Sequence, residues 1–245
     1  MKIVGIIPSR LKSTRVPDKP LVDILGIPMI VHVYKRASLS SILDEVIVAT
    51  DSKEIQSVVH RYRGKAVLTS DKHLNGTERI AEVAASMEAD VFVLINGDEA
   101  LLNPEHVKDS VDTLLHSDAD SSILVLDFYK KNSPGDFKVV LNAQSEVMYI
   151  SRNDIPSDAR NEVKSMLKAY HVLSFRKEFL MKYATMEKSP MEKIEDHEHL
   201  RIIENGFKLK AKKVESSSIS VDTPDDLAYV RRVMPDDLFY LKYAK

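Results

Sequence analysis

Short, almost wholly apolar runs alternate with amphipathic segments through the first half of the chain, and this alternation restricts the fold more than any other feature. The apolar runs are rich in Val and Ile and lie at Ile3–Ile7, Glu45–Ala49, Ala66–Leu68 and Val91–Ile95. Such runs are typical of strands buried on both faces of a sheet. The segments between them have a helical period and cover Pro28–Ser38, Lys53–Arg63 and Thr77–Glu88. Strand–helix–strand alternation predicts a doubly wound, mostly parallel α/β sheet with right-handed crossovers.

The second half of the chain is less regular and predicts a small mixed-sheet extension. Strands are expected in quick succession at Ser122–Phe128, Phe137–Leu141, Val147–Ile150 and Tyr170–Phe175. The later pattern predicts a helix over Met191–Glu204, a strand over Phe207–Val214 and a strand over Ser218–Val221. A last helix follows, with Thr223 and Asp226 as its capping box. Because no repeat or linker interrupts the pattern, we expect one domain over residues 1–245.

Composition excludes several classes of protein. The chain has 245 residues, with 35 basic and 37 acidic side chains and a net charge of −2, so its overall charge predicts no nucleic-acid or anionic-membrane partner. It has no cysteine, which excludes disulfides, thiolate catalysis and zinc fingers. The apolar runs are far shorter than a membrane span, and the N-terminus lacks the apolar core of a signal peptide. These features allow a reducing, cytoplasmic setting.

The residues that follow the predicted strands are the candidates for a ligand site, because ligands of doubly wound sheets bind beyond the carboxyl ends of the strands. After the first strand comes a loop, Pro8–Pro20, with four cations at Arg10, Lys12, Arg15 and Lys19 and two hydroxyls between them at Ser13 and Thr14. Such a loop at a strand end favours binding of a polyphosphate, whereas a solvated basic loop is the plainer alternative. The chain contains neither a Walker P-loop nor a G-x-G-x-x-G motif.

Two carboxylates at strand ends are candidate ligands of a divalent metal. Asp98 follows the strand Val91–Ile95 directly, and Asp222 follows the predicted strand Ser218–Val221. Mg²⁺ favours one or two protein carboxylates and takes the rest of its ligands from water and substrate phosphates. The alternative for each aspartate is that it caps the next turn.

A further candidate is the segment His73–Arg79, in which Asn75 or Thr77 is expected to cap a helix. Arg79 falls near the start of this helix, where a cation is unfavourable without an anionic partner, and this hints at a bound anion. The segment Asp196-His197-Glu198-His199 has metal-binding side chains. On the helix expected there, however, the four side chains point in different directions, which argues against a zinc site.

The sequence resembles those of the 3-deoxy-manno-octulosonate (Kdo) cytidylyltransferases, also called CMP-Kdo synthetases, over nearly the whole chain. The resemblance is carried by the following segments: Ile7–Arg10, Ser13–Leu21, Gly26–Tyr34, Val48–Asp51, Thr69–Ser70, Gly76–Val83, Gly97–Glu99, Lys138–Leu141, Tyr149–Arg152, Ser189–Glu192 and Val221–Pro224. It implies a Rossmann-like nucleotidyltransferase fold and transfer of CMP from CTP to the anomeric hydroxyl of Kdo or a related 2-keto sugar acid, with release of pyrophosphate. It also implies Mg²⁺ as cofactor, a cytoplasmic homodimer and a role in lipopolysaccharide biosynthesis.

The resemblance also assigns roles to single residues. The residues that it implies for nucleotide binding are Pro8, Ser9, Arg10, Ser13, Arg15, Lys19, Ser70, Gly76 and Arg79. Arg15, Lys19, Asp98 and Asp222 would be catalytic, and Asp98 and Asp222 would hold the metal. Those that it implies for acceptor binding are Asn96, Lys168, Glu198 and His199. The middle third of the domain, about residues 125–200, would supply acceptor-binding and dimerisation elements.

The chain departs from the family pattern mainly on the acceptor side. Asn96 and His199 stand where the family usually has Gln, and Ala100 stands where it usually has Pro. Ala169 and Leu173 stand where it usually has His and Tyr. Loss of a polar contact to the substrate can change specificity by orders of magnitude. The alternatives are therefore a cytidylyltransferase for a different acid or phosphorylated acceptor, and a non-catalytic CTP-binding paralogue.

Overall fold

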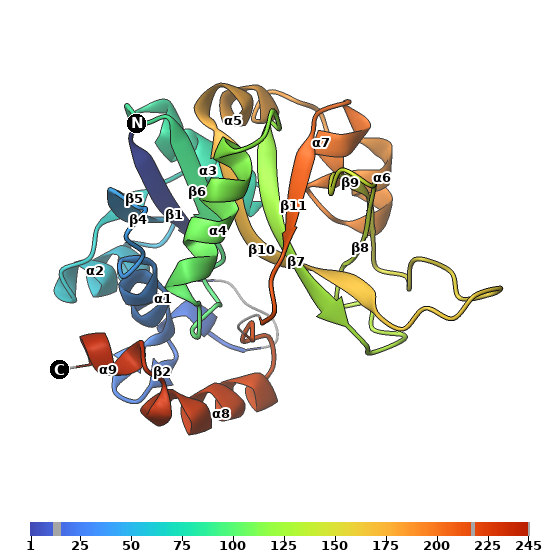
Figure 1. Cartoon of the computed structure of the whole chain (residues 1–245). Coiled ribbons are helices and arrows are strands. Elements are labelled where there is room, and N and C mark those ends of the chain that lie inside the picture. Colours follow the sequence, from blue (N-terminus) through green and yellow to red (C-terminus); the bar gives the residue numbers. More distant parts are fainter. Residues whose placement is uncertain (12–15, 217–218, 245) are drawn as a thin grey trace. The chain divides into compact units, whose positions relative to one another are not determined.

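The protein, represented by a computed structural model that describes residues 1–11, 16–216 and 219–244, folds as two compact units. Unit 1 comprises Met1–Lys108 and Ser218–Lys245, and unit 2 comprises Asp109–Ser217. Helix α4 (Pro104–Leu115) contains the boundary between them (Figure 1). Within the described residues, no helix combines the length and the apolar character needed to cross a bilayer. The expectation of one domain over residues 1–245 stays a prediction.

The sheet of unit 1 is parallel. Its strands are β1 (Ile3–Ser9), β4 (Glu45–Thr50), β5 (Ala66–Leu68) and β6 (Val91–Ile95). They lie in the order β6-β1-β4-β5, and each neighbouring pair is parallel. The five residues of β6 are all buried, as their unbroken apolar sequence requires. The predicted parallel α/β sheet is confirmed.

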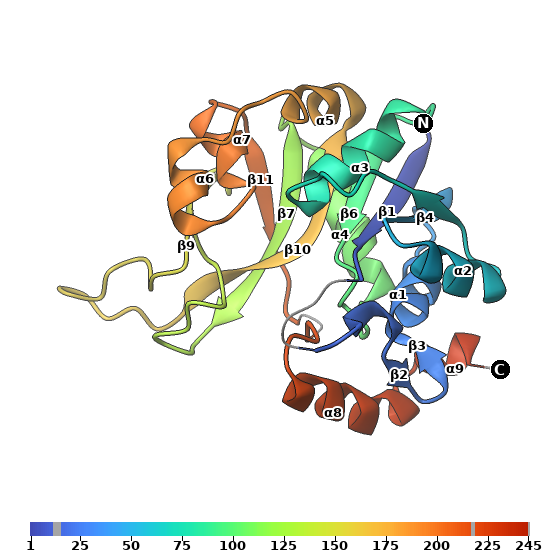
Figure 2. The same cartoon turned by 180° about the vertical axis from the view of Figure 1, so that it is seen from behind.

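Three helices connect the strands of unit 1: α1 (Met29–Ala37), α2 (Lys53–Arg61) and α3 (Gly76–Ala85). The chain runs from β1 to β4 to β5 and then returns to the other side of β1 to form β6. With right-handed connections, this reversal puts α3 on the face opposite to α1 and α2. Figure 2 shows α3 in front of the strands. The reversal makes the carboxyl ends of β1 and β6 the expected ligand site.

The remaining elements of unit 1 are η1 (Lys19–Leu21), β2 (Asp23–Ile24), β3 (Ile27–Pro28), α8 (Pro224–Val233), η2 (Met234–Asp236) and α9 (Tyr240–Tyr243). An apolar cluster joins β2, α8 and η2. The buried members of the cluster are Ile24, Met29, Ala100, Val221, Leu227, Val230 and Met234. The predicted capping box of α8 is confirmed. The predicted strand at Ser218–Val221 is wrong for its described residues, 219–221, which are held by apolar burial of Val221 instead of by a sheet.

Unit 2 contains a mixed sheet, as predicted for the second half of the chain. Its strands are β7 (Ser121–Phe128), β8 (Lys138–Leu141), β9 (Val147–Ser151), β10 (Met166–Arg176) and β11 (Leu209–Lys213). Strand β7 pairs in parallel with β11 and antiparallel with β10. Strand β8 pairs antiparallel with both β10 and β9.

The helices of unit 2 are short: α5 (Lys177–Tyr183), α6 (Pro190–Glu195) and α7 (Leu200–Glu204). The prediction of one helix over Met191–Glu204 is wrong. Asp196 has a left-handed backbone (φ 49°), which ends α6. On a continuous helix, Glu192 and Arg201 would point in opposite directions. The break lets the Arg201 guanidinium reach the Glu192 carboxylate, with Nη2 2.6 Å from Oε1.

Candidate active site

Three side chains from distant parts of the sequence meet in unit 1, where β1 and β6 end. The ammonium nitrogen of Lys19 lies 2.7 Å from Oδ2 of Asp98 and 3.2 Å from Oδ1 of Asp222. Lys19 begins η1, Asp98 follows β6, and Asp222 precedes α8. The structure therefore brings together the lysine predicted to bind phosphate and both carboxylates predicted to bind metal.

The position of Asp222 depends on contacts of its neighbours with the segment after β6. The backbone N–H of Val221 donates to the carbonyl of Asp98 at 3.1 Å. The hydroxyl of Ser220 donates to the buried carboxylate of Glu99. Val221 and Ala100 share the apolar cluster of unit 1. Because the two segments are tied together by hydrogen bonds and apolar packing, the side chains of Asp98 and Asp222 face the same cation.

The electrostatics of this group favour a bound cation. Burial lowers the pKa of Lys19, but the carboxylates of Asp98 and Asp222 outweigh this effect and hold the pKa above its usual value. The other oxygen of Asp98, Oδ1, is buried and has no hydrogen-bond partner among the described residues. An unpaired buried carboxylate oxygen is costly, and a metal ion or a donor on a ligand would satisfy it. The two carboxylates therefore fit a divalent cation such as Mg²⁺.

The loop after β1 supplies further polar groups to the same edge of the sheet. Ser9 is 7% exposed, and its hydroxyl has no partner among the described residues. Arg10 is exposed, and Pro8 is half-buried. A Cβ atom on Gly97 would lie 3.0 Å from the carbonyl oxygen of Pro8, so glycine allows the segment after β6 to approach β1 closely. Ser13 and Arg15 lie outside the described residues.

Arg79 of α3 is 4% exposed and is held by groups at the ends of β4 and β5. Its guanidinium donates to Oγ1 of Thr69 at 2.6 Å, to the carbonyl of Ser70 at 3.2 Å and to Oδ2 of Asp51 at 3.3 Å. The sequence hinted that Arg79 needs an anionic partner. Asp51 provides one from within the protein, because β4 and β5 are neighbours in the sheet.

The helix N-terminus beside Arg79 is formed as predicted. Asn75 caps α3, and its side-chain oxygen accepts from the backbone N–H of Glu78 at 2.8 Å. Gly76 and Ser70, the other two residues predicted to bind nucleotide here, are both half-buried.

The four residues predicted to bind the acceptor belong to different units. Asn96 is half-buried in unit 1, directly after β6. Lys168 of unit 2 forms an ion pair with Asp136, and its Nζ lies 5.5 Å from the centre of the Phe128 ring.

The other two predicted acceptor residues are adjacent in unit 2. The backbone carbonyl of Glu198 accepts from the hydroxyl of Tyr183 at 3.0 Å. His199 is 2% exposed, and its ring packs against His197, with centroids 5.0 Å apart, and His171, with centroids 5.9 Å apart. Sequence reasoning missed this grouping of histidines because it assumed that the segment from residue 196 to 199 was helical.

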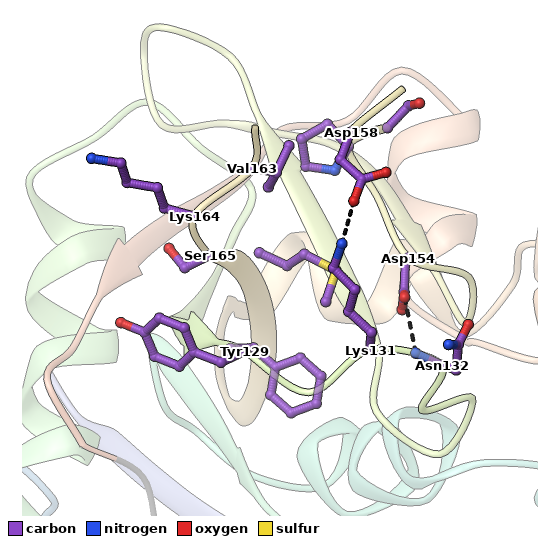
Figure 3. Close-up of a pocket in the computed structure, with 12 residues that line it drawn as sticks. Tyr129, Lys131, Asn132, Asp154, Asp158, Val163, Lys164 and Ser165 are labelled. Atoms are coloured by element: carbon purple, nitrogen blue, oxygen red, sulfur yellow. Dashed lines mark hydrogen bonds and ion pairs between the residues drawn. The ribbon is translucent and has the colours of Figure 1, made fainter. Parts of the chain in front are cut away.

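A separate cavity of about 320 Å³ lies in unit 2 (Figure 3). The cavity is lined by residues from Phe128 to Met166 and by none of the described residues predicted for the site. Among its charged groups, Lys131 pairs with Asp158, and Asp154 accepts from the backbone N–H of Asn132 at 2.9 Å. Because ligands of doubly wound sheets bind beyond the carboxyl ends of the strands, the strand ends of unit 1 remain the better candidate for a polyphosphate site.

Comparison with known proteins places the sequence among nucleotide-transferring enzymes. The sequence model of the family described as cytidylyltransferase matches residues 4–214. A 3-deoxy-manno-octulosonate cytidylyltransferase of Geotalea uraniireducens is 38% identical over 248 residues, which cover 94% of this chain and 98% of that protein. The protein of the same name from Escherichia coli is 35% identical over 244 residues, which cover 97% and 98%.

A solved structure is also similar over nearly the full length. It is that of CMP:2-keto-3-deoxy-manno-octonic acid synthetase complexed with CTP. The two structures superpose with a TM-score of 0.92 and are 34% identical in sequence, and the match covers 97% of this chain and 100% of the other. The similarity therefore includes both compact units.

Proposed function

The chain belongs to the cytidylyltransferase family, and we propose that it transfers CMP from CTP to the anomeric hydroxyl of Kdo and releases pyrophosphate. Its relatives named for this activity match almost from end to end. In the reaction, the anomeric oxygen forms a bond to the α-phosphorus while the bond from that phosphorus to the bridging β-oxygen breaks. The product is an activated sugar acid for lipopolysaccharide biosynthesis.

The placement of Lys19 between Asp98 and Asp222 is the observation that carries the proposal. The three groups lie where β1 and β6 end, at the reversal of the sheet, which is where doubly wound folds bind their ligands. A cation held between two carboxylates at this edge suits an enzyme that must place a magnesium nucleotide beside a basic group. Phosphoryl transfer requires mainly such positioning and neutralisation of charge.

Mg²⁺ is the proposed cofactor, and Asp98 and Asp222 would hold it. When bound, Mg²⁺ polarises phosphate oxygens and lowers the pKa of a coordinated hydroxyl. The buried Oδ1 of Asp98, which has no partner among the described residues, would then have the metal ion as its partner. None of the chain's side chains is assigned as a dedicated base, so the proton of the anomeric hydroxyl would pass to solvent.

The remaining nucleotide roles fall to groups at the strand ends of unit 1. Lys19, together with Arg15, which lies outside the described residues, would stabilise the negative charge that develops on pyrophosphate. Arg10 would neutralise the triphosphate, and the unpartnered hydroxyl of Ser9 would donate to it. Ser13, which also lies outside the described residues, is likewise proposed to bind the triphosphate.

The other nucleotide-binding residues of the proposal are Ser70, Gly76 and Arg79. Arg79 is already fixed by Thr69, Ser70 and Asp51, so it would shape the nucleotide pocket with little rearrangement. A preorganised side chain loses less conformational entropy when the ligand binds.

On the acceptor side, we propose that Asn96, Lys168, Glu198 and His199 recognise the sugar acid. Residues of about 125–200 would also supply the dimer contacts of a cytoplasmic homodimer. The ammonium of Lys168 is 34% exposed at its side chain, so it can attract a carboxylate from solution despite its pairing with Asp136.

The test is release of pyrophosphate from CTP and Mg²⁺ by the full chain, with and without Kdo. Kdo-dependent release is expected. Other 2-keto sugar acids and phosphorylated acceptors form a matched panel. Pyrophosphate release with one of these compounds and not with Kdo would mean that the enzyme is a cytidylyltransferase with a different acceptor. Binding of CTP without release for any acceptor would favour the non-catalytic paralogue and contradict the proposal.

A further inference from the structure

Three histidines of unit 2 form a compact cluster. His171 belongs to β10, and His197 and His199 lie between α6 and α7 (Figure 1). One ring nitrogen from each residue lies within 4.8 Å of one from each of the others. The Nε2 atoms of His171 and His197 are 3.3 Å apart. That separation is what two nitrogen ligands have around one tetrahedral metal ion at the usual metal–nitrogen distance of about 2.0–2.1 Å.

The backbone on both sides of the cluster departs from regular structure. The pairing of β10 with β7 shifts register between Tyr170 and Leu173, so His171 lies in a β-bulge. Bulges redirect side chains and occur beside functional sites. The left-handed Asp196 ends α6 just before His197. His197 and His199 therefore lie in a turn, where the two side chains can face the same point.

Several ring nitrogens of the cluster are buried without a partner. His197 is 4% exposed and His199 is 2% exposed. Among the described residues, Nδ1 of His197 and both ring nitrogens of His199 have no hydrogen-bond partner. Burying a polar nitrogen without a partner costs about 1–3 kcal/mol. A metal ion in the cluster would satisfy one of the two unpartnered nitrogens of His199.

We propose that His171, His197 and His199 form a binding site for a divalent transition-metal cation of the zinc class. Imidazole nitrogen suits Zn²⁺ and its neighbours in the first transition series, whereas Mg²⁺ prefers oxygen. The site is thus chemically distinct from the carboxylate pair of unit 1. Three histidines leave one tetrahedral position open to water or a small ligand, and the half-buried His171 provides access from solvent.

The surroundings of the cluster are compatible with a bound cation. Burial, followed by the neighbouring histidines, holds the pKa values of His197 and His199 well below their usual range. Oε1 of Glu198 lies 3.8 Å from Nε2 of His199. A carboxylate near a metal-binding histidine orients its ring and strengthens it as a ligand.

The guanidinium of Arg152 acts electrostatically on His197 and opposes a metal ion there, but it is already engaged. It donates to the carbonyls of Pro134, Glu195 and Asp196 at 3.0, 2.7 and 3.2 Å. It also stacks 4.4 Å from the centre of the Phe137 ring. Its charge is therefore directed to the end of α6 and to this ring.

The test measures metal binding by the untagged full chain, because a histidine tag would bind the same ions. The protein is stripped with a chelator and titrated with Zn²⁺, and in parallel with Co²⁺, whose visible absorption reports nitrogen ligands. The variants are His199→Gln and His171→Ala, the second at a half-buried position that is less important for folding. His116→Ala, at an exposed histidine outside the cluster, is the matched control.

We expect one equivalent of metal in wild type and His116→Ala, and affinity at least about 100-fold weaker in both cluster variants. The same variants should lose the rise in melting temperature that Zn²⁺ gives to wild type, while their metal-free melting curves show that they are folded. Asp98→Asn should keep the Zn²⁺ site, which separates this proposal from the one for unit 1. Absence of binding by wild type, or equal binding by the folded cluster variants, would overturn the inference.

Discussion

Lys19 in unit 1 and Lys138 in unit 2 are both shielded from solvent, but their ammonium groups have opposite surroundings. The side chain of Lys19 is 17% exposed, and its charge is balanced by Asp98 and Asp222. The side chain of Lys138 is 0% exposed, and the carboxylate with which it pairs, that of Asp154, lies farther from its Nζ, at 3.8 Å. Its Nζ donates to three backbone carbonyls, those of Ser133 and Asp136 at 2.7 Å each and that of Arg152.

The ammonium of Lys19 has partners that it can exchange for a ligand, whereas the ammonium of Lys138 does not. Two carboxylates around Lys19 accept another cation equally well, and an anion from outside can attract the ammonium away from them. The three carbonyls around Lys138 are main-chain dipoles, which hold one ammonium in one geometry and join the segment before β8 to the residue after β9. We therefore interpret the carboxylate pair around Lys19 as part of a binding site. We interpret the carbonyl cage around Lys138 as a contact that stabilises the fold of unit 2.

The largest expected effect comes from breaking the unit 1 group at Asp98. Asp98→Asn keeps the shape of the side chain but removes the charge that would hold Mg²⁺. We expect turnover to fall by about 10³-fold or more, because electrostatic groups of this kind lower the barrier by several kcal/mol. The measurement is pyrophosphate release at saturating CTP, with a melting curve to show that the variant is folded.

The matched control for Asp98→Asn is Asp225→Asn, at an exposed aspartate in the first turn of α8. This variant loses the same charge only three residues from Asp222. Its turnover is expected to stay near that of wild type. Equal losses in the two variants would mean that net charge, and not ligation by Asp98, controls the rate.

The meeting of Lys19, Asp98 and Asp222 could be predicted from the sequence because it follows from a general rule of the fold. Carboxyl ends of parallel strands share one edge, so residues that follow different strands become neighbours. Asp222 was placed correctly at this edge although its predicted strand does not form. The capping box at Thr223 and Asp226 starts α8 at the right residue, and so aligns the residue before it.

The cluster of histidines could not be predicted because it depends on tertiary contacts. A helical pattern runs through residues 191–204, and the buried pairing of Arg201 with Glu192 favours a break over a continuous helix. The bulge that contains His171 likewise depends on how β10 pairs with β7. Local sequence reports neither contact, so periodicity alone gave the wrong helix and hid the H-x-H turn.

The next largest effect comes from breaking the unit 2 cage. Lys138→Met keeps the apolar stem but leaves three carbonyl oxygens without their donor. We expect the free energy of unfolding to fall by about 3 kcal/mol, since each unsatisfied buried acceptor costs about 1–3 kcal/mol and the cage relaxes in part. Urea unfolding gives this value. Lys131→Met, at an exposed ion pair with Asp158, is the control and should change stability little. Similar values for both variants would contradict the cage.

A smaller effect is expected from removing the N-cap of α8, which tests whether this cap positions Asp222. Thr223→Ala removes the hydroxyl that accepts from the N–H of Asp226 at 3.2 Å at the start of α8. Loss of such a cap costs about 1 kcal/mol of stability. Because Asp222 precedes the cap directly, we also expect the KM for CTP–Mg²⁺ to rise while CTP binding without metal stays unchanged. Loss of stability with an unchanged KM would show that the position of Asp222 does not depend on the cap.

The smallest expected effect concerns pH. The contributions of the two lysines to the free energy of unfolding should change with pH in opposite directions. Burial lowers the pKa of Lys138, and the carboxylates of Asp154 and Asp136 offset this only in part. Between that lowered pKa and the ordinary lysine value of about 10.4, the unfolded chain binds more protons, so this group's contribution to stability rises with pH. For Lys19 the pKa is raised. Above about 10.4 the folded chain binds more protons there, and the contribution falls as pH rises through the raised pKa.

Urea unfolding from about pH 8 to about pH 11 measures both slopes when wild type is compared with each lysine variant. The difference in the free energy of unfolding between wild type and Lys138→Met should grow as pH rises toward about 10.4. The difference between wild type and Lys19→Met should be constant below about 10.4 and shrink above it. At the low end of this pH range, where Mg²⁺ stays in solution, saturating Mg²⁺ should reduce the second difference and leave the first unchanged, because the metal competes with the ammonium only between Asp98 and Asp222. Parallel slopes for the two lysines would contradict the contrast between a carboxylate pair and a carbonyl cage.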